Sequence, residues 1–69
     1  MVNGKKIKKL REDAQLTTFE LAEMVYTSQA MISSVELGIK SPSVALLKRI
    51  ADKFGVIVDD LLVEEITNK

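Results

Sequence analysis

The chain has 69 residues, of which 46% are hydrophobic and 29% charged, and its ten basic and ten acidic residues give a net charge of zero. This length supports one globular domain, expected over residues 1–69, and the neutral charge argues against a coat that binds nucleic acid through charge alone. The sequence contains neither cysteine nor histidine, which excludes a disulfide framework and removes the commonest metal ligand and acid–base side chain. We therefore predict no enzyme activity, no metal site and no cofactor.

The chain is predicted to be all helical, because apolar residues recur at helical spacing and no segment alternates long enough for a strand. A first helix is expected after Asn3, which is suited to cap it, with Ile7, Leu10 and Ala14 along one face. Five basic residues precede Glu12, so charge is unevenly distributed along the neutral chain.

A second helix is predicted to begin at Thr17, because Thr17 and Glu20 have the spacing of a capping box. In that motif the threonine hydroxyl accepts from the N–H of the third helical residue, and the glutamate side chain accepts from the threonine N–H. The inner face of this helix is predicted to contain Leu21, Ala22 and Val25.

A third helix follows after a very short connection. Ser28 is a favourable N-cap, and Gly38 stands where a helix ends in the left-handed conformation. The residues predicted to face inwards are Ile32 and Val35. Two capped helices this close in sequence must cross steeply, and Ala22 supplies the small side chain that a close crossing needs. Residues 17–37 therefore predict a helix-turn-helix, whose second helix projects outwards and fits the DNA major groove.

Two further helices are predicted in the last third of the chain. One is capped by Ser41 or Ser43, follows Pro42 and ends at Gly55. Its buried stripe is predicted to be Val44, Leu47, Ile50, Ala51 and Phe54. A fifth helix is expected from about residue 58 to residue 66, with two aspartates in its first turn, where they suit the helix dipole. The predicted fold is therefore an all-α, compact five-helix bundle.

Short motifs follow one another with defined gaps along the chain. They are Ile7–Arg11, Leu16–Glu23, Thr27–Gly38, Pro42–Ser43, Leu47–Ala51, Gly55–Val56 and Leu61–Leu62. This ordered set resembles the lambda-repressor-like, Cro/XRE-type helix-turn-helix family over about residues 5–63. The resemblance implies a DNA-binding transcriptional regulator that binds a palindromic operator as a dimer, and we predict a small repressor.

The resemblance also implies roles for individual residues. The positions where the family reads bases or the adjoining backbone are Gln29, Ala30, Ser33 and Ser34. Their chemistry agrees, because glutamine pairs with adenine N6 and N7, an alanine methyl contacts the thymine methyl, and serine bonds several bases. The positions expected to bind phosphates are Thr18, Ser28 and Lys40.

Three departures from the family pattern bear on DNA affinity. Thr18 stands where glutamine is usual, and its shorter side chain weakens the expected phosphate contact. Tyr26 stands where the turn usually has glycine and often needs a positive φ. Leu37 and Ile39 flank Gly38 where polar or basic residues are more frequent, so we expect modest phosphate affinity.

The charged residues near the N-terminus receive two different interpretations. Arg11 and Glu36 resemble a family pair that ties the first helix to the third, and we interpret them as a partly buried structural ion pair rather than a DNA contact. The lysines of residues 5–9 are expected to remain solvated rather than to lie in a DNA groove, and to steer DNA towards the protein.

Apolar residues at positions expected on the surface bear on whether the protein assembles with itself or with a partner. A homodimer is expected through the predicted fifth helix, at Leu62, Val63 and Ile66, because their apolar surface exceeds the need of a monomer. A second set is apolar where the family pattern predicts surface, namely Phe19, Tyr26, Met31, Leu37 and Ile39. Either a patch for a protein partner or self-association, or partial burial against helix ends, accounts for this set.

Two functions compete on this evidence. The first is a sequence-specific DNA-binding regulator. The second is a protein-interaction module of the same fold, an antirepressor or partner-binding protein with weak DNA affinity, which the neutral charge and the departures from the family favour. We expect a cytoplasmic protein without membrane association, because no apolar run approaches the about 20 residues that span a bilayer and no export signal follows the basic N-terminus.

Overall fold

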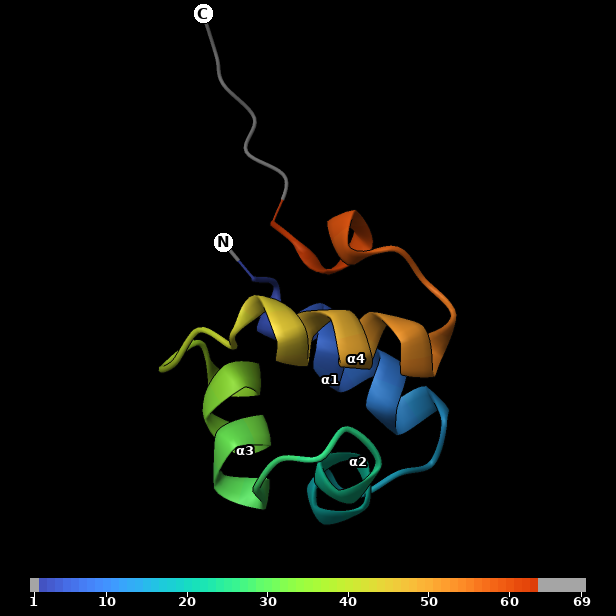
Figure 1. Cartoon of the computed structure of the whole chain (residues 1–69). Coiled ribbons are helices and arrows are strands. Elements are labelled where there is room, and N and C mark those ends of the chain that lie inside the picture. The colour runs from blue at the N-terminus through green and yellow to red at the C-terminus, as the bar shows by residue number, and fades with distance from the viewer. Residues whose placement is uncertain (1, 64–69) are drawn as a thin grey trace, which may run out of the picture.

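The computed structural model describes residues 2–63, and these residues form four α-helices and one turn of 3-10 helix. The elements are α1 (Gly4–Asp13), α2 (Thr18–Met24), α3 (Gln29–Leu37), α4 (Val44–Phe54) and the 3-10 helix η1 (Val58–Leu61). Figure 1 shows α2 and α3 at one end of the molecule, α1 and α4 across its middle, and η1 at the other end. The predicted all-α class is confirmed, and none of the helices in this range is long and apolar enough to cross a bilayer.

Side-chain caps begin all four α-helices. Asn3, Thr17 and Ser28 accept hydrogen bonds from backbone N–H groups in the first turns of α1, α2 and α3. The capping box is complete, because Thr17 N–H also donates to Glu20 Oε1 over 2.8 Å. Of the two candidate serines, Ser43 caps α4. Each such cap contributes about 1 kcal/mol to helix stability.

One cluster of buried apolar side chains joins the five elements. It consists of Ile7, Leu21, Ala22, Val25, Ile32, Val35, Leu46, Leu47, Ile50, Ala51 and Leu61. Within this cluster α2 packs mainly on α3, α3 also packs on α1, and η1 packs on α4 and α1. Burial of each leucine, isoleucine or valine contributes about 1.5–3 kcal/mol, so α3 is held mainly by the core behind it.

The predicted buried stripe of α4 is wrong at its first position. Val44 is 81% exposed, whereas Leu46 is buried. Leu46 lies four residues before Ile50 and eight before Phe54, so these three side chains form one column of the helix. Val44 is the first residue of α4. Phe54 is only partly buried against the cluster.

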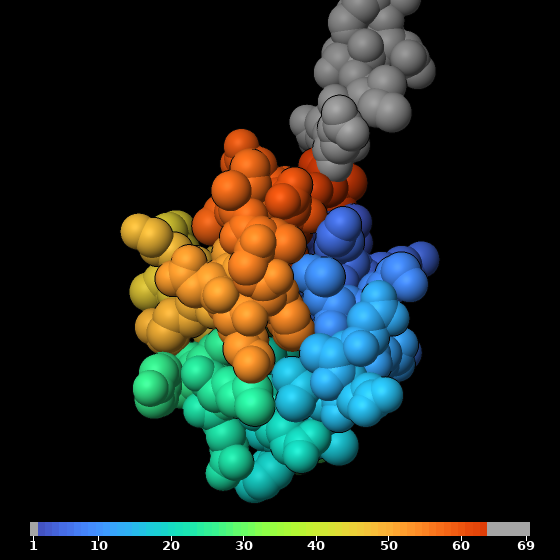
Figure 2. Space-filling model, turned by 90° about the vertical axis from the view of Figure 1, so that its right-hand side faces the viewer, coloured from blue at the N-terminus to red at the C-terminus, as the bar shows by residue number. Residues whose placement is uncertain are grey.

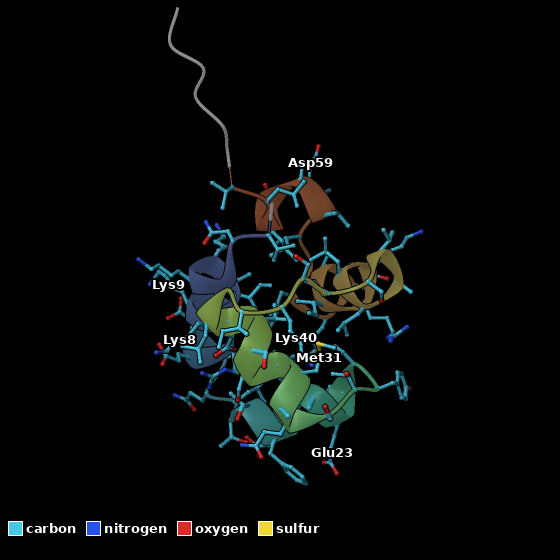
Figure 3. The ribbon with its side chains drawn as sticks, turned by 90° about the vertical axis from the view of Figure 1, so that its left-hand side faces the viewer. Lys8, Lys9, Glu23, Met31, Lys40 and Asp59 are labelled. Carbon is cyan, nitrogen blue, oxygen red and sulfur yellow. The ribbon has the colours of Figure 1, made fainter. Side chains whose placement is uncertain are left out.

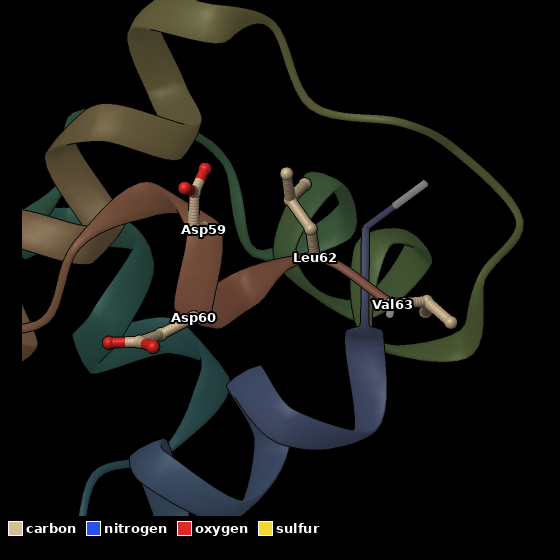
Figure 4. Close-up of a pocket in the computed structure, with 4 residues that line it drawn as sticks. All are labelled: Asp59, Asp60, Leu62 and Val63. Carbon is tan, nitrogen blue, oxygen red and sulfur yellow. The ribbon is translucent and has the colours of Figure 1, made fainter. Parts of the chain in front are cut away.

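The predicted fifth helix is also wrong. Within residues 58–63 only the 3-10 turn Val58–Leu61 forms, and Leu62 is already in extended conformation. The Asn3 N–H donates to Leu61 O over 2.7 Å, and Val2 and Leu62 form an isolated antiparallel bridge. Figure 4 shows this extended segment beside the N-terminal residues. Pairing with the N-terminus competes with continuation of the helix, because it uses the same backbone groups.

The start of α1 lies unusually close to the end of α3. A methyl group added at Gly4 would lie 2.3 Å from the carbonyl oxygen of Val35 and 2.5 Å from that of Glu36. Gly4 therefore permits a backbone-to-backbone approach that any larger residue would prevent. Figure 2 looks onto the side where α1, α4 and η1 lie, and it shows α2 and the following turn at the lower end of the molecule.

Candidate nucleic-acid interface

The turn between α2 and α3 is tight, and hydrogen bonds to α2 and from α4 hold it in place. Thr27 N–H donates to Ala22 O over 2.9 Å, and Arg49 of α4 donates through Nε to Val25 O over 2.8 Å. Tyr26 has a φ of 62°, in the left-handed region predicted for this position, and its side chain is 82% exposed. This conformation costs a non-glycine residue about 1–2 kcal/mol, and no packing by the tyrosine ring offsets it.

The outward surface of α3 begins at its capped N-terminus. Gln29 and Ala30 are exposed in the first turn, and Ser28 is exposed just before it. The Ser28 hydroxyl accepts from Met31 N–H over 3.1 Å, yet its own proton remains available to an outside acceptor. Figure 3 shows α3 on the near side of the molecule, with Lys40 beyond its end. The first turn of α3 thus presents uncharged polar and small side chains to solvent.

Two predicted site residues contact each other directly. Gln29 donates through Nε2 to Thr18 Oγ1 over 2.9 Å, which links the starts of α3 and α2. One amide hydrogen and the amide oxygen of Gln29 remain free, and these are the groups that pair with adenine N6 and N7. Thr18 therefore orients the Gln29 amide, in addition to lying near the surface where a phosphate contact was expected.

The remaining predicted site residues are distributed along α3 and past its end. Ser33 and Ser34 are half-buried, so they offer less surface than Gln29 and Ala30. Lys40 is exposed, and its N–H donates to Ser34 O over 3.3 Å, which holds the following loop against the end of α3. The predicted residues thus lie on or beside one helix about 14 Å long.

Arg11 and Glu36 form a bidentate ion pair between α1 and α3. Arg11 donates through Nε and Nη2 to the two Glu36 carboxylate oxygens over 2.6 and 3.0 Å. Arg11 also donates through Nη1 to Leu16 O over 2.8 Å, which adds the loop before α2 to the same network. These hydrogen bonds with Glu36 raise the pKa of Arg11, although burial acts to lower it. The pair fixes three segments relative to one another.

A shallow groove lies between α1 and α3, next to the outward surface of α3. The residues that line it are Lys5, Lys8, Arg11, Ser33, Glu36 and Leu37. Ser33 therefore belongs both to the predicted base-reading set and to this groove. The sequence pattern assigned Lys5 and Lys8 to solvent and did not indicate that they share a hollow with α3.

The apolar residues outside the expected core separate into two groups. Phe19, Tyr26, Leu37 and Ile39 are exposed, with Leu37 and Ile39 at 74% and 69%. Met31 differs, because it is partly buried against the core. Of the two alternatives left open for this set, partial burial therefore holds for Met31, whose side chain packs against the core.

Of the residues assigned to a dimer surface, Leu62 and Val63 do not lie in a helix. Leu62 is half-buried against the core and Val63 is 41% exposed, and both line a shallow hollow with Asp59 and Asp60 (Figure 4). Ile66 lies outside the described residues. Within residues 2–63, no cluster of acidic side chains is arranged to hold a metal ion.

Two residues that position this interface were not identified from the sequence. Gly4 allows α1 to approach α3, and Arg49 fastens the turn before α3. Neither carries a local signal, because a glycine at a helix start and an arginine within a helix are both ordinary. The roles of Gly4 and Arg49 become visible only in the structure, where helices that are far apart in the sequence lie close together.

The helix-turn-helix family model matches residues 7–61 of the chain. The chain is 39% identical over 59 residues to the HTH-type transcriptional activator BcrR of Enterococcus faecalis, covering 86% of this chain and 29% of that protein. It is 31% identical over 65 residues to the immunity repressor protein of Bacillus phage phi105, covering 94% of this chain and 45% of that protein. The chain thus spans less than half the length of each of these curated relatives.

A solved structure supports the same fold. The structure of the biofilm master regulator SinR in complex with DNA superimposes with a TM-score of 0.77 at 29% identity. The match covers 84% of this chain and 94% of that chain. Helix order and packing are therefore shared over most of both chains.

Proposed function

Because this chain belongs to the Cro/C1-type helix-turn-helix family, we propose that it is a sequence-specific DNA-binding transcriptional regulator and that α3 reads its bases. The family match covers nearly all of the described residues, whereas the residue roles are our proposal. Gln29, Ala30, Ser33 and Ser34 read bases, and Thr18, Ser28 and Lys40 contact phosphates. No catalytic role is proposed.

The observation that carries this proposal is the exposed first turn of α3. Ser28 caps it, Thr18 orients the Gln29 amide, and Ala30 adds a methyl group beside it. A helix of this kind fits the major groove, where a bidentate contact contributes about 1–3 kcal/mol of discrimination. Names of the relatives agree, since one is an activator, one a repressor and one was solved with DNA.

Selection of bound duplexes from a random DNA pool tests the proposal. We expect the selected sequence to bind at least about 10³-fold more tightly than random duplex at about 100 mM salt. Equal affinity for both would contradict sequence-specific regulation.

The role of Gln29 is tested by Gln29→Ala. Loss of its amide should reduce discrimination at one base pair by about 1–3 kcal/mol and leave affinity for random duplex nearly unchanged. If all duplexes lose affinity equally, Gln29 binds the backbone rather than a base. Glu23→Ala, at an exposed position of α2, serves as a control for general effects of truncation.

We further propose that two copies bind one palindromic operator. A single α3 reads only a few base pairs, so useful specificity needs two half-sites about one helical turn apart. Leu62 and Val63 offer apolar surface for such contact. A two-to-one complex on a selected palindrome, measured by sedimentation, is the expected result, and a saturating one-to-one complex is the opposing one.

The second candidate function is a protein-binding module with weak DNA affinity. The observation that favours it is the exposure of Tyr26, Leu37 and Ile39 near the two ends of α3. The double substitution Tyr26→Ser/Ile39→Ser separates the two candidate functions. If the protein reads DNA, the variant should still prefer the selected duplex over random duplex, because neither residue lies on the first turn of α3.

A further inference from the structure

The groove between α1 and α3 joins the basic flank of α1 to the surface of α3. Lys5 and Lys8 stand one turn apart on α1 and are exposed. Ser33 and Leu37 stand one turn apart on α3 and form the opposite side of the groove. A duplex lying against α3 therefore comes within reach of two long, flexible lysine side chains.

The groove has a positive charge that the structure does not neutralise. Arg11 and Glu36 compensate each other at 2.6 Å. The other ion pair within residues 2–63 joins Lys9 to Asp13 at 3.6 Å, so neither Lys5 nor Lys8 has a carboxylate partner there. Glu12 lies one turn beyond Lys8 but does not line the groove. Two ammonium groups thus border a hollow beside α3.

We propose that Lys5 and Lys8 bind the DNA phosphates flanking the bases read by α3. This inference rests on the proposed function and extends the DNA footprint from the helix-turn-helix to α1. Lysine binds phosphate as a point charge. Contacts of this kind with the DNA backbone fix how a recognition helix lies in the major groove of the DNA. They also supply positive charge to an interface where Leu37 and Ile39 provide none. Figure 3 shows Lys8 and Lys9 beside α1.

The test compares two lysine pairs on the same helix. Lys5→Ala/Lys8→Ala and Lys6→Ala/Lys9→Ala remove equal charge, but Lys6 and Lys9 do not line the groove. The measured quantity is the slope of log Kd against log salt concentration, to which each phosphate contact contributes about 0.9. We expect the groove pair to lower this slope by about 1.8 and the control pair to leave it nearly unchanged. The ratio of the Kd for random duplex to the Kd for the selected duplex should stay the same, because phosphate contacts carry no sequence information.

Two results would overturn the inference. Equal slope changes for both pairs would mean that the lysines act only by long-range steering, and an unchanged slope for the groove pair would mean that they touch no phosphate. Thermal melting checks that both variants fold, and Lys→Gln versions of each pair replace any alanine variant that does not. The slope is measurable on random duplex as well. If the unaltered protein shows no sequence preference, the proposed function is contradicted. The salt slopes on random duplex still decide whether Lys5 and Lys8 bind phosphates.

Discussion

At the scale of single residues, Thr18 shows how a departure from a family pattern is accommodated. Its side chain is too short to reach far into solvent, but its hydroxyl accepts from the Gln29 amide over 2.9 Å. If Gln29 reads a base as proposed, Thr18 acts on DNA through Gln29. A polar contact of this kind contributes about 0.5–1.5 kcal/mol, enough to bias the orientation of an exposed side chain.

Replacing Thr18 by valine removes the hydroxyl and keeps the shape. We expect discrimination at the base pair read by Gln29 to fall about fivefold, in line with one neutral hydrogen bond of about 1 kcal/mol. Affinity for random duplex should change little. Binding to duplexes altered at each position of the selected site measures this effect, and undiminished discrimination would show that Gln29 needs no support from Thr18.

Gly4 is a second residue whose role depends on one close approach. Gly4→Ala places a methyl group 2.3 Å from Val35 O, so α1 and α3 must separate. We expect the free energy of unfolding to fall by about 1–3 kcal/mol, although alanine is the better helix former. Chemical denaturation measures this change. The exposed neighbour Lys5→Ala is the control and should change stability by less than about 0.5 kcal/mol; a gain in stability from Gly4→Ala would contradict the packing described.

At the scale of elements, α3 is positioned by polar ties as well as by the core. Arg11 joins α1, the loop at Leu16 and α3, while Arg49 joins α4 to the turn at Val25. The contacts of Arg11 with Glu36 and of Arg49 with Val25 join residues 25 and 24 positions apart. The orientation of α3, on which the proposed base reading depends, therefore follows from contacts made by α1 and α4.

Breaking the ion pair on one side tests this positioning. Arg11→Met leaves the Glu36 carboxylate, whose side chain is 6% exposed, without its partner. We expect a loss of about 3–5 kcal/mol in unfolding free energy, because an unpaired buried charge is costly. The double variant Arg11→Met/Glu36→Leu should recover much of this loss. Denaturation of these two variants and of Glu36→Leu alone measures the coupling, and simple additivity of the two single changes would exclude it.

At the scale of the whole molecule, the chain has no net charge, but half of its basic side chains lie on α1, which packs on α3. The residues proposed to read bases lie on α3 at one end, and η1 lies at the opposite end (Figure 1). The exposed Lys5 and Lys8 of α1 lie beside α3, where we propose that they bind phosphates. A net charge of zero is thus compatible with a local positive surface, because binding responds to nearby charges within about one Debye length.

The charge composition also predicts how stability depends on pH. The sequence has no histidine. Hydrogen bonds with Glu36 raise the pKa of Arg11 above its ordinary value, so its stabilising contribution is complete throughout the neutral range and is lost only at strongly alkaline pH. We expect the free energy of unfolding to vary by less than about 1 kcal/mol between pH 6 and 9. Thermal melts across this range provide the measurement, and a steep transition near neutrality would contradict it.

Local sequence determined much of the fold and the start of the candidate site. Asn3, Thr17 and Ser28 cap their helices as predicted, Gly38 ends α3 with a φ of 79°, and Tyr26 adopts the expected positive φ. These features depend on residues within one helical turn, so the pattern contains the necessary information.

Only the tertiary structure decided features that depend on distant partners. Pairing with Val2 holds Leu62 in an extended conformation directly after η1, and Val44 is exposed although it fits the apolar stripe of α4. Gly4 matters because α3 passes close to it, and Lys8 borders α3 because α1 lies alongside. Backbone pairing, burial and proximity of this kind are properties of how the helices pack, and no window of neighbouring residues encodes them.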